Sequence, residues 1–248
     1  MGRVLIFLYG IICYVLFFLT FLYLIAFVGN FGILPYIPKT IDSGTPGPIG
    51  QALLVNLSLI VLFALTHTVM ARPWFKEKWT KIVPAAAERS TYVLVSSLVL
   101  ILLFREWVPM TDTVWKVANP TMALVLWVLY FTGYGIVLLS SFLINHFELF
   151  GLSQVLANLK RTSMPGFNFA QPLLYKIVRH PLYVGWIMAF WATPDMSTGH
   201  LVFAVGMTAQ ILISIPHEEH DLEEALGEPY KDYKRRTPML VPFMKSKR

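Results

Sequence analysis

Long apolar runs separated by short polar stretches dominate the first 145 residues. Four runs approach the roughly 20 residues that a helix needs to cross a bilayer, the third being the shortest: Val4–Val28, Ala52–Met70, Tyr92–Phe104 and Met122–Ile144. Two shorter runs, Tyr183–Trp191 and Leu201–Ile215, flank the turn-rich segment Thr193–Gly199. The pattern predicts four membrane-spanning helices and a shorter helical hairpin, which either dips in from one side or crosses twice.

The composition places the chain in lipid. Only 14% of its residues are charged and 56% are hydrophobic, whereas soluble domains carry about 25% charged residues. The first apolar run follows Arg3, but it is too long for a signal peptide and no small-residue cleavage site follows, so we expect a retained anchor. Cys13 is the single cysteine and is expected to be a buried packing residue, because it has no internal partner for a disulfide.

Lysine and arginine predict the orientation. The segments 72–89 and 146–181 hold five and four of them and the stretch after Pro216 holds seven, whereas 30–50 and 105–119 hold one and two. The positive-inside rule therefore predicts cytosolic amino and carboxyl termini, in a bacterial inner membrane. The net charge of +6 indicates attraction to the inner leaflet rather than nucleic-acid binding, since no basic and aromatic platform is present.

The chain is expected to fold as one all-α domain, residues 1–248. Residues 1–145 form the four-helix membrane bundle, and residues 146–248 form a more polar half around the hairpin, giving five to six membrane segments in total. After Pro216 we expect an acidic helix that stops at Gly227, and then a second short helix on which Tyr230, Tyr233 and Arg236 recur every three residues. These two helices make a cytosolic tail.

Two ionisable clusters flank the hairpin. Arg179-His180-Pro181 comes directly before it, and Glu218-Glu219 comes directly after it. If the chain enters the membrane at Pro181 and returns near Pro216, both clusters arrive on the same side and at the same depth. A charge at a membrane boundary is costly unless it binds a ligand or serves chemistry, although anchoring side chains and helix-dipole acids remain the simpler alternative.

The same residues form a recognisable set of motifs. Arg179-His180-Pro181-x-Tyr183-x-Gly185, then Glu218-Glu219-x-x-Leu222, then Leu226-Gly227-x-x-Tyr230-x-x-Tyr233-x-x-Arg236 resembles the isoprenylcysteine carboxyl methyltransferase superfamily of membrane enzymes. The resemblance implies an S-adenosylmethionine site built from the carboxyl half and closed over by the tail. It implies cofactor contacts for Phe167, Asn168, Phe169, Ala170, Tyr175, His180, Pro181, Leu182, Tyr183 and Glu218. Four further motif residues are assigned to the same site, with closure of the tail as their expected role: Glu219, Tyr230, Tyr233 and Arg236.

A narrower resemblance concerns the methyl acceptor. Ser214 stands where the isoprenylcysteine branch has an arginine, which argues against a substrate that carries a carboxylate. The segments Phe27–Asn30, Pro38–Gly44 and Asn145–Gly151 resemble the bacterial methanethiol S-methyltransferases. This resemblance implies methyl transfer from S-adenosylmethionine to methanethiol, giving dimethyl sulfide. The alternatives are another thiol, a phospholipid amine, or a membrane accessory protein without enzymatic activity.

Several residues are candidates for the acceptor side. His146 is the predicted base for the thiol proton, with Glu148 orienting it, although both also fit as interface residues at a helix end. Arg179 is placed in the catalytic set, and the substrate pocket is expected to involve Asn145, Trp186 and Ser214. His67 is interpreted as a helix-contact residue and Asp42 as part of a turn. No metal site is predicted, because His217 and His220 have no third ligand, and the sequence does not indicate the oligomeric state.

Overall fold

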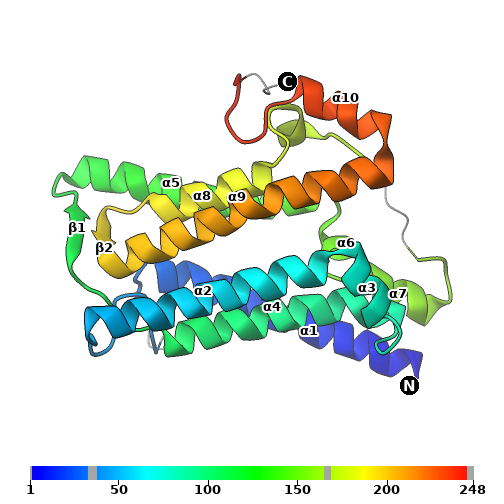
Figure 1. Ribbon diagram of the computed structural model, residues 1–248, viewed down its shortest axis with the longest axis horizontal. Helices are drawn as coiled ribbons and strands as arrows, with labels where there is room; N and C mark the ends of the chain where they lie inside the picture. The colour runs from blue at the N-terminus through cyan, green and yellow to red at the C-terminus, as the bar shows by residue number, and fades with distance from the viewer. Residues whose placement is uncertain (1, 33–37, 165–168, 245–248) are drawn as a thin grey trace.

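Six helices lie side by side in two layers in the computed structural model, which describes residues 2–32, 38–164 and 169–244 (Figure 1). One layer holds α1 (Arg3–Val28), α2 (Ile49–Ala71) and α4 (Ala85–Glu106). The other holds α5 (Pro120–Leu143), α8 (Pro181–Trp191) and α9 (Thr198–Leu226). The predicted all-α bundle is confirmed.

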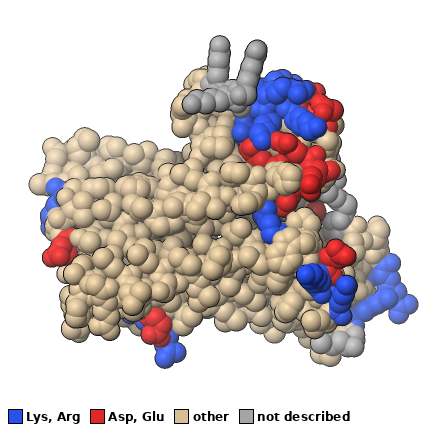
Figure 2. Space-filling view, viewed as in Figure 1, with Lys and Arg blue, Asp and Glu red and all other residues tan. Residues whose placement is uncertain are grey.

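The helices are suited to a lipid environment. Five of them, all but α8, are long and apolar enough to cross a membrane. Large apolar side chains such as Leu54, Ile12 and Leu124 are exposed on the outside of the bundle. On the face shown in Figure 2, residues other than Lys, Arg, Asp and Glu cover the middle of the molecule, and the charged residues gather toward its ends. The chain is therefore an integral membrane protein.

The two ends of the bundle differ in structure. Four short helices, α3 (Pro73–Trp79), α6 (His146–Leu149), α7 (Leu152–Lys160) and α10 (Glu228–Arg236), lie at one end, which we call the α10 end (Figure 1). The 3₁₀ turn η1 (Leu173–Lys176) precedes α8. At the opposite end, the strand end, β1 (Thr113–Lys116) pairs antiparallel with β2 (Asp195–Ser197), so that Thr113 faces Ser197.

The small sheet settles how far the hairpin of α8 and α9 extends. β1 lies in the connection between α4 and α5, and β2 forms the tip of the hairpin. The hairpin therefore reaches the same end of the bundle as the connection between two spanning helices. α9 is long enough to cross a membrane, whereas α8, with 11 residues, is shorter than the five candidate spanning helices.

The predicted acidic helix after Pro216 is not a separate element. It is the last part of α9, which continues through Pro216 to Leu226. Proline removes one N–H from the helix ladder, but Pro216 and Leu212, four residues earlier, both lie on the exposed side of α9. α9 ends at Gly227, as predicted, because this residue has a positive φ of 64° that favours glycine.

Two glycines set the position of α8 against α5. A Cβ on Gly133 would lie 2.7 Å from the backbone oxygen of Gly185, and a Cβ on Gly185 would lie 2.6 Å from the oxygen of Gly133. Small residues let membrane helices approach this closely. The close contact fixes the helix that follows Arg179 and His180, and thereby fixes one wall of the candidate site.

Candidate functional site

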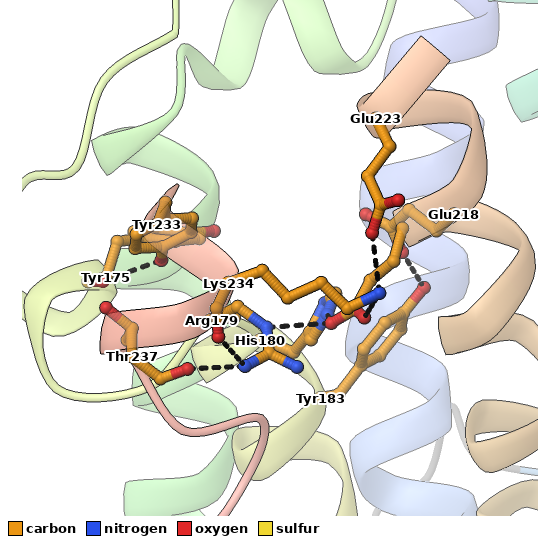
Figure 3. Close-up of polar contacts among 10 residues, drawn as sticks. Tyr175, Arg179, His180, Tyr183, Glu218, Glu223, Tyr233, Lys234 and Thr237 are labelled. Carbon is orange, nitrogen blue, oxygen red and sulfur yellow. Dashed lines mark hydrogen bonds and ion pairs between the residues drawn. The ribbon is translucent and has the colours of Figure 1, made fainter. Parts of the chain in front are cut away.

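The two adjacent acids of α9 face different surroundings. The side chain of Glu219 is only 5% exposed, and its Oε1 accepts hydrogen bonds from Arg179 Nε at 2.8 Å and from His180 Nε2 at 3.0 Å. Its Oε2 lies 3.0 Å from Lys234 Nζ on α10 (Figure 3). We call these four residues the buried knot: Arg179, His180, Glu219 and Lys234.

The knot ties the tail to the start of the hairpin. Arg179 also donates from Nη1 to the backbone oxygens of Lys234, at 3.1 Å, and of Thr237. The backbone N–H groups of Arg179 and His180 donate to Pro238 and Met239, at 2.8 and 3.2 Å. The guanidinium is thus engaged by Glu219 and by the tail itself. This geometry makes Arg179 a holding residue, whereas the sequence places it in the catalytic set.

Aromatic contacts extend this attachment along α10. Tyr233 donates from its hydroxyl to the backbone oxygen of Tyr175 at 2.6 Å (Figure 3). The ring of Phe169 lies 5.9 Å from that of Tyr230 and 5.5 Å from that of Tyr233. Burial raises the pKa of Tyr233 to about 12, so its hydroxyl remains a donor at neutral pH. The expected role of both tyrosines in holding the tail matches these contacts.

Other predicted members of the cofactor set fall outside this region. Arg236 is exposed, and its side chain donates to the backbone oxygen of Asp232 in its own helix. Ala170 is also exposed. Phe167 and Asn168 lie outside the described residues.

Glu218 lies at the second, more open part of the site. It is half-buried, and its Oε2 accepts a hydrogen bond from the hydroxyl of Tyr183 on α8 at 2.8 Å (Figure 3). Tyr175 lies within electrostatic range of Glu218, and burial raises the pKa of Tyr175 well above its ordinary value, with a further contribution from the charge of Glu218. We call Glu218, Tyr183 and Tyr175 the acidic face.

The acidic face has the chemistry of a site for an organic cation. A carboxylate attracts positive charge, and the faces of nearby phenol rings do the same. Pro181 is buried as the first residue of α8, and Leu182 is half-buried beside it. Both residues directly precede Tyr183 in the first turn of α8.

Helices α2 and α9 meet on the other side of Glu218. Ser214, one helical turn earlier on α9, lies 3.2 Å from the hydroxyl oxygen of Thr68 and accepts from Gln210 at 3.0 Å. Arg72 pairs with Asp221 at 2.9 Å. Along α9, Glu218 therefore lies between Ser214 and Asp221, the two residues that make these polar contacts. Ser214 remains a predicted substrate residue, with its hydroxyl in contact with α2 and with Gln210.

His146 lies in an aromatic environment at the α10 end. Its Nε2 is 2.8 Å from the hydroxyl of Tyr14, its Nδ1 is 2.8 Å from Oγ of Ser141, and its ring stacks on Phe142. Burial lowers the pKa of His146, which keeps the imidazole neutral at pH 7. The orienting role of Glu148 stays a prediction. Its carboxylate accepts from Asn145 at 2.6 Å, while the two hydroxyls hold the imidazole.

Aromatic rings link His146 to the hairpin. Phe150 lies 4.8 Å from His146 and stacks at 4.0 Å on Phe17, which is 6.3 Å from Phe21. The ring of Phe21 is 5.9 Å from that of Trp186 on α8. Of the three residues predicted for the substrate, Trp186 lies on α8, Ser214 lies on α9, and Asn145 directly precedes α6.

His67 on α2, interpreted from the sequence as a helix-contact residue, contacts two side chains of α4. His67 lies 3.2 Å from Oγ of Ser96 and 3.0 Å from the hydroxyl of Tyr92. The signal was present, because a histidine inside a spanning helix suggests a functional role, but its partners are distant in sequence. Asp42 also has more than a turn role. It accepts hydrogen bonds from Asn30 and from Ser197 in β2, and so fastens the loop after α1 to the hairpin.

The candidate site is identified by its ionisable and phenolic side chains, and it does not coincide with the cavity of about 550 Å³. This cavity lies between α1 and α4, lined mainly by apolar side chains such as Leu16, Leu19 and Ile101. It lies away from both clusters that flank the hairpin. Within the described ranges, His, Cys, Asp and Glu side chains do not gather in groups of three that could hold a metal ion.

The fold and the site define an integral membrane protein of helical-bundle type, with a carboxylate and phenol site where the hairpin meets its tail. The chain belongs to the NnrU protein family, which it matches over residues 55–241. It is 48% identical over 247 residues to "Methanethiol S-methyltransferase 2" of Bradyrhizobium diazoefficiens, covering 100% of this chain and 93% of that protein. It is 46% identical over 243 residues to the "Methanethiol S-methyltransferase" of Mycobacterium tuberculosis, covering 98% of each.

A more distant relative is the "Nurim homolog" of Drosophila pseudoobscura pseudoobscura, 30% identical over 169 residues, which cover 66% of this chain and 67% of that protein. No solved structure matches the chain. The predicted resemblance to the bacterial methanethiol S-methyltransferases is confirmed.

Proposed function

We propose that this protein is an S-adenosylmethionine-dependent methyltransferase that converts methanethiol to dimethyl sulfide. The names of the bacterial relatives support the reaction, because the similarity extends over essentially the whole chain. The acidic face is the structural observation that carries the proposal. It places a carboxylate, held by one phenol and close to another, at the junction of α8, α9 and η1.

The residues of the acidic face fit the proposed methyl donor. When bound, S-adenosylmethionine supplies a methyl group on a positively charged sulfur. Glu218 offers a carboxylate to the positive charge or to ribose hydroxyls, and Tyr183 fixes the direction of that carboxylate. Tyr175 adds an aromatic wall, and the buried knot holds the tail next to this wall.

The acceptor side fits a small apolar thiol. Methanethiol partitions into lipid, and the rings between His146 and Trp186 provide an apolar lining for it. Removal of water favours a reaction in which a thiolate and a cation cancel their charges, provided that the two partners are held in position. The thiol has to lose its proton, and His146 is the base that the sequence predicts.

In this proposal the site opens toward the cytosol. The α10 end contains all the connections rich in lysine and arginine that the sequence assigns to the inner side. The acidic face and the buried knot lie at the same end, where a water-soluble methyl donor enters. We place the protein in the bacterial inner membrane, with both termini in the cytosol.

The decisive test compares Glu218→Gln with Glu224→Gln in the purified, detergent-solubilised protein. Glu224 lies on the same helix, is exposed and pairs with His220 one turn earlier, so it is a matched control. We expect wild type and Glu224→Gln to bind S-adenosylhomocysteine by calorimetry and to release dimethyl sulfide into the headspace. Glu218→Gln should lose at least 100-fold in affinity and activity.

Each failure has a separate meaning. Wild type that binds S-adenosylhomocysteine but forms no dimethyl sulfide would point to another acceptor, such as a different thiol or a phospholipid amine. Wild type that does not bind S-adenosylhomocysteine would point to an accessory protein without enzymatic activity. Unchanged binding in Glu218→Gln would disprove the assignment of the acidic face.

A further inference from the structure

A second imidazole lies inside the membrane bundle next to the candidate site. His67 on α2 is within 3.0 Å of the hydroxyl of Tyr92 on α4, and its Nδ1 is 3.2 Å from Oγ of Ser96. The rings of His67 and Phe63 stack with their centroids 5.1 Å apart. A histidine, a phenol and a hydroxyl in one interior cluster are costly in a membrane unless they serve a function.

The position of this cluster connects it to Glu218. Thr68, the residue after His67, contacts Ser214 at 3.2 Å, one helical turn before Glu218 on α9. On the other side of Glu218, Arg72 pairs with Asp221 at 2.9 Å. Tyr92 lies within electrostatic range of both Glu218 and Tyr183. The part of α2 that carries His67 therefore packs against the part of α9 that carries Glu218.

We propose that Tyr92 contacts the acceptor thiol and that His67 receives the thiol proton through the Tyr92 hydroxyl. The inference rests on the proposed function. The S–H bond of the thiol breaks, its proton passes to Tyr92, and the proton of the Tyr92 hydroxyl passes to His67. The sulfur lone pair then forms the new bond to the methyl carbon of the sulfonium donor, whose own carbon–sulfur bond breaks and leaves a neutral thioether. His67 returns the proton to water before the next turnover.

This role distinguishes His67 from His146. The hydroxyls that contact His146 belong to Tyr14 on α1 and Ser141 on α5, and neither helix carries a residue of the acidic face. The partner of His67 instead lies toward the carboxylate that we assign to the methyl donor. The charged groups near the His67 and Tyr92 pair are Arg72 just after α2, Glu88 and Arg89 on α4, and Glu218 on α9. The Arg89 guanidinium lies 5.2 Å from the centre of the Tyr92 ring.

The test measures dimethyl sulfide formation by His67→Gln as a function of pH. A base contributes about 10²–10⁴-fold to the rate, so we expect at least a 100-fold loss at pH 7. A cysteine thiol has a pKa of about 8.5 and a simple alkanethiol is less acidic, so methanethiol is mostly protonated at pH 7 to 8. The deficit should therefore shrink about tenfold for each pH unit, because hydroxide then supplies the thiolate. Tyr92→Phe should show the same dependence and a loss of similar size, because the proton reaches His67 through the Tyr92 hydroxyl.

Two controls separate this role from a structural one. His200→Gln removes another buried imidazole, which contacts the backbone oxygen of Phe190 far from Glu218, and it should keep activity at every pH. Binding of S-adenosylhomocysteine by calorimetry should stay within about twofold of wild type in His67→Gln and Tyr92→Phe. This readout also shows that the variants are folded.

The outcomes distinguish the inference from the function on which it rests. A deficit of His67→Gln that does not change with pH, or one that belongs to His146→Gln instead, would overturn the proton role of His67 while leaving the methyltransferase proposal intact. A wild-type protein that forms no dimethyl sulfide would overturn both.

Discussion

Glu218 and Glu219 are neighbours in the sequence but belong to different regions of the molecule. Glu219 is enclosed by Arg179, His180 and Lys234 and is almost completely buried. Glu218 is half-buried and accepts a hydrogen bond from Tyr183. The difference separates a carboxylate that ties the tail to the start of α8 from one that, in our proposal, is presented to a ligand.

The geometry of a helix explains this division. Successive residues of an α-helix point about 100° apart, so Glu219 turns toward α10 and the start of α8 while Glu218 turns toward Tyr183 and α2. A buried charge requires several partners to offset its loss of water. A carboxylate that is to bind a cation has to keep part of its hydrogen-bonding capacity free. The two regions satisfy these opposite requirements one residue apart.

The largest expected effect on stability comes from breaking the buried knot. Glu219→Gln leaves the Arg179 guanidinium buried without its counter-charge, and losing one partner of a buried pair costs about 3–5 kcal/mol. We expect a clear decrease in the free energy of unfolding, measured by denaturant titration in detergent, with Glu224→Gln as control. A Glu219→Gln protein as stable as wild type would show that the two acids do not differ in role.

Tyr183→Phe tests the role of Glu218, the less buried acid of the pair. It removes the hydroxyl that donates to Glu218, and a hydrogen bond to a charged group is worth about 1.5–3 kcal/mol. We expect roughly 10- to 100-fold weaker binding of S-adenosylhomocysteine by calorimetry. The free energy of unfolding should change far less than in Glu219→Gln. The reverse order of effects would contradict the assignment of the acidic face.

Lys234→Met tests the exposed edge of the knot. The Lys234 side chain is 37% exposed, so solvent screens its pairs and we expect a loss below about 1 kcal/mol that decreases further at high salt. Partial burial lowers the pKa of Lys234, but hydrogen bonds to Glu223 and Glu219 outweigh this and the net pKa is raised above 10.5. A raised pKa adds stability below pH 10.5 that is lost as the pH rises further. Unfolding titrations of wild type and Lys234→Met should therefore converge above that pH.

Arg236→Ala is expected to have the smallest effect. Its side chain is exposed and contacts the backbone of Asp232 in its own helix, so stability should stay within about 0.5 kcal/mol and ligand affinity should be unchanged. A marked loss of S-adenosylhomocysteine binding would show that Arg236 reaches the site, as the family motif implies.

The tail shows where sequence reasoning succeeded and where it stopped. Spacing placed Tyr230 and Tyr233 near one helix face, and both are buried. The same spacing included Arg236, but three residues advance a helix by about 300°, so each step turns 60° away from the first residue. After six residues the side chain has left the contact face, and Arg236 is exposed.

The sequence by itself determined the membrane class, the long spanning helices and the two ionisable clusters that meet beside the hairpin. These features depend on the hydropathy of continuous segments and on motifs that are local in the chain. Only the tertiary structure decided which acid is enclosed, that Arg179 contacts the tail, and that His67 and Tyr92 contact each other. Those facts depend on contacts between helices distant in sequence, and the direction of a side chain is fixed only when its helix packs against its neighbours.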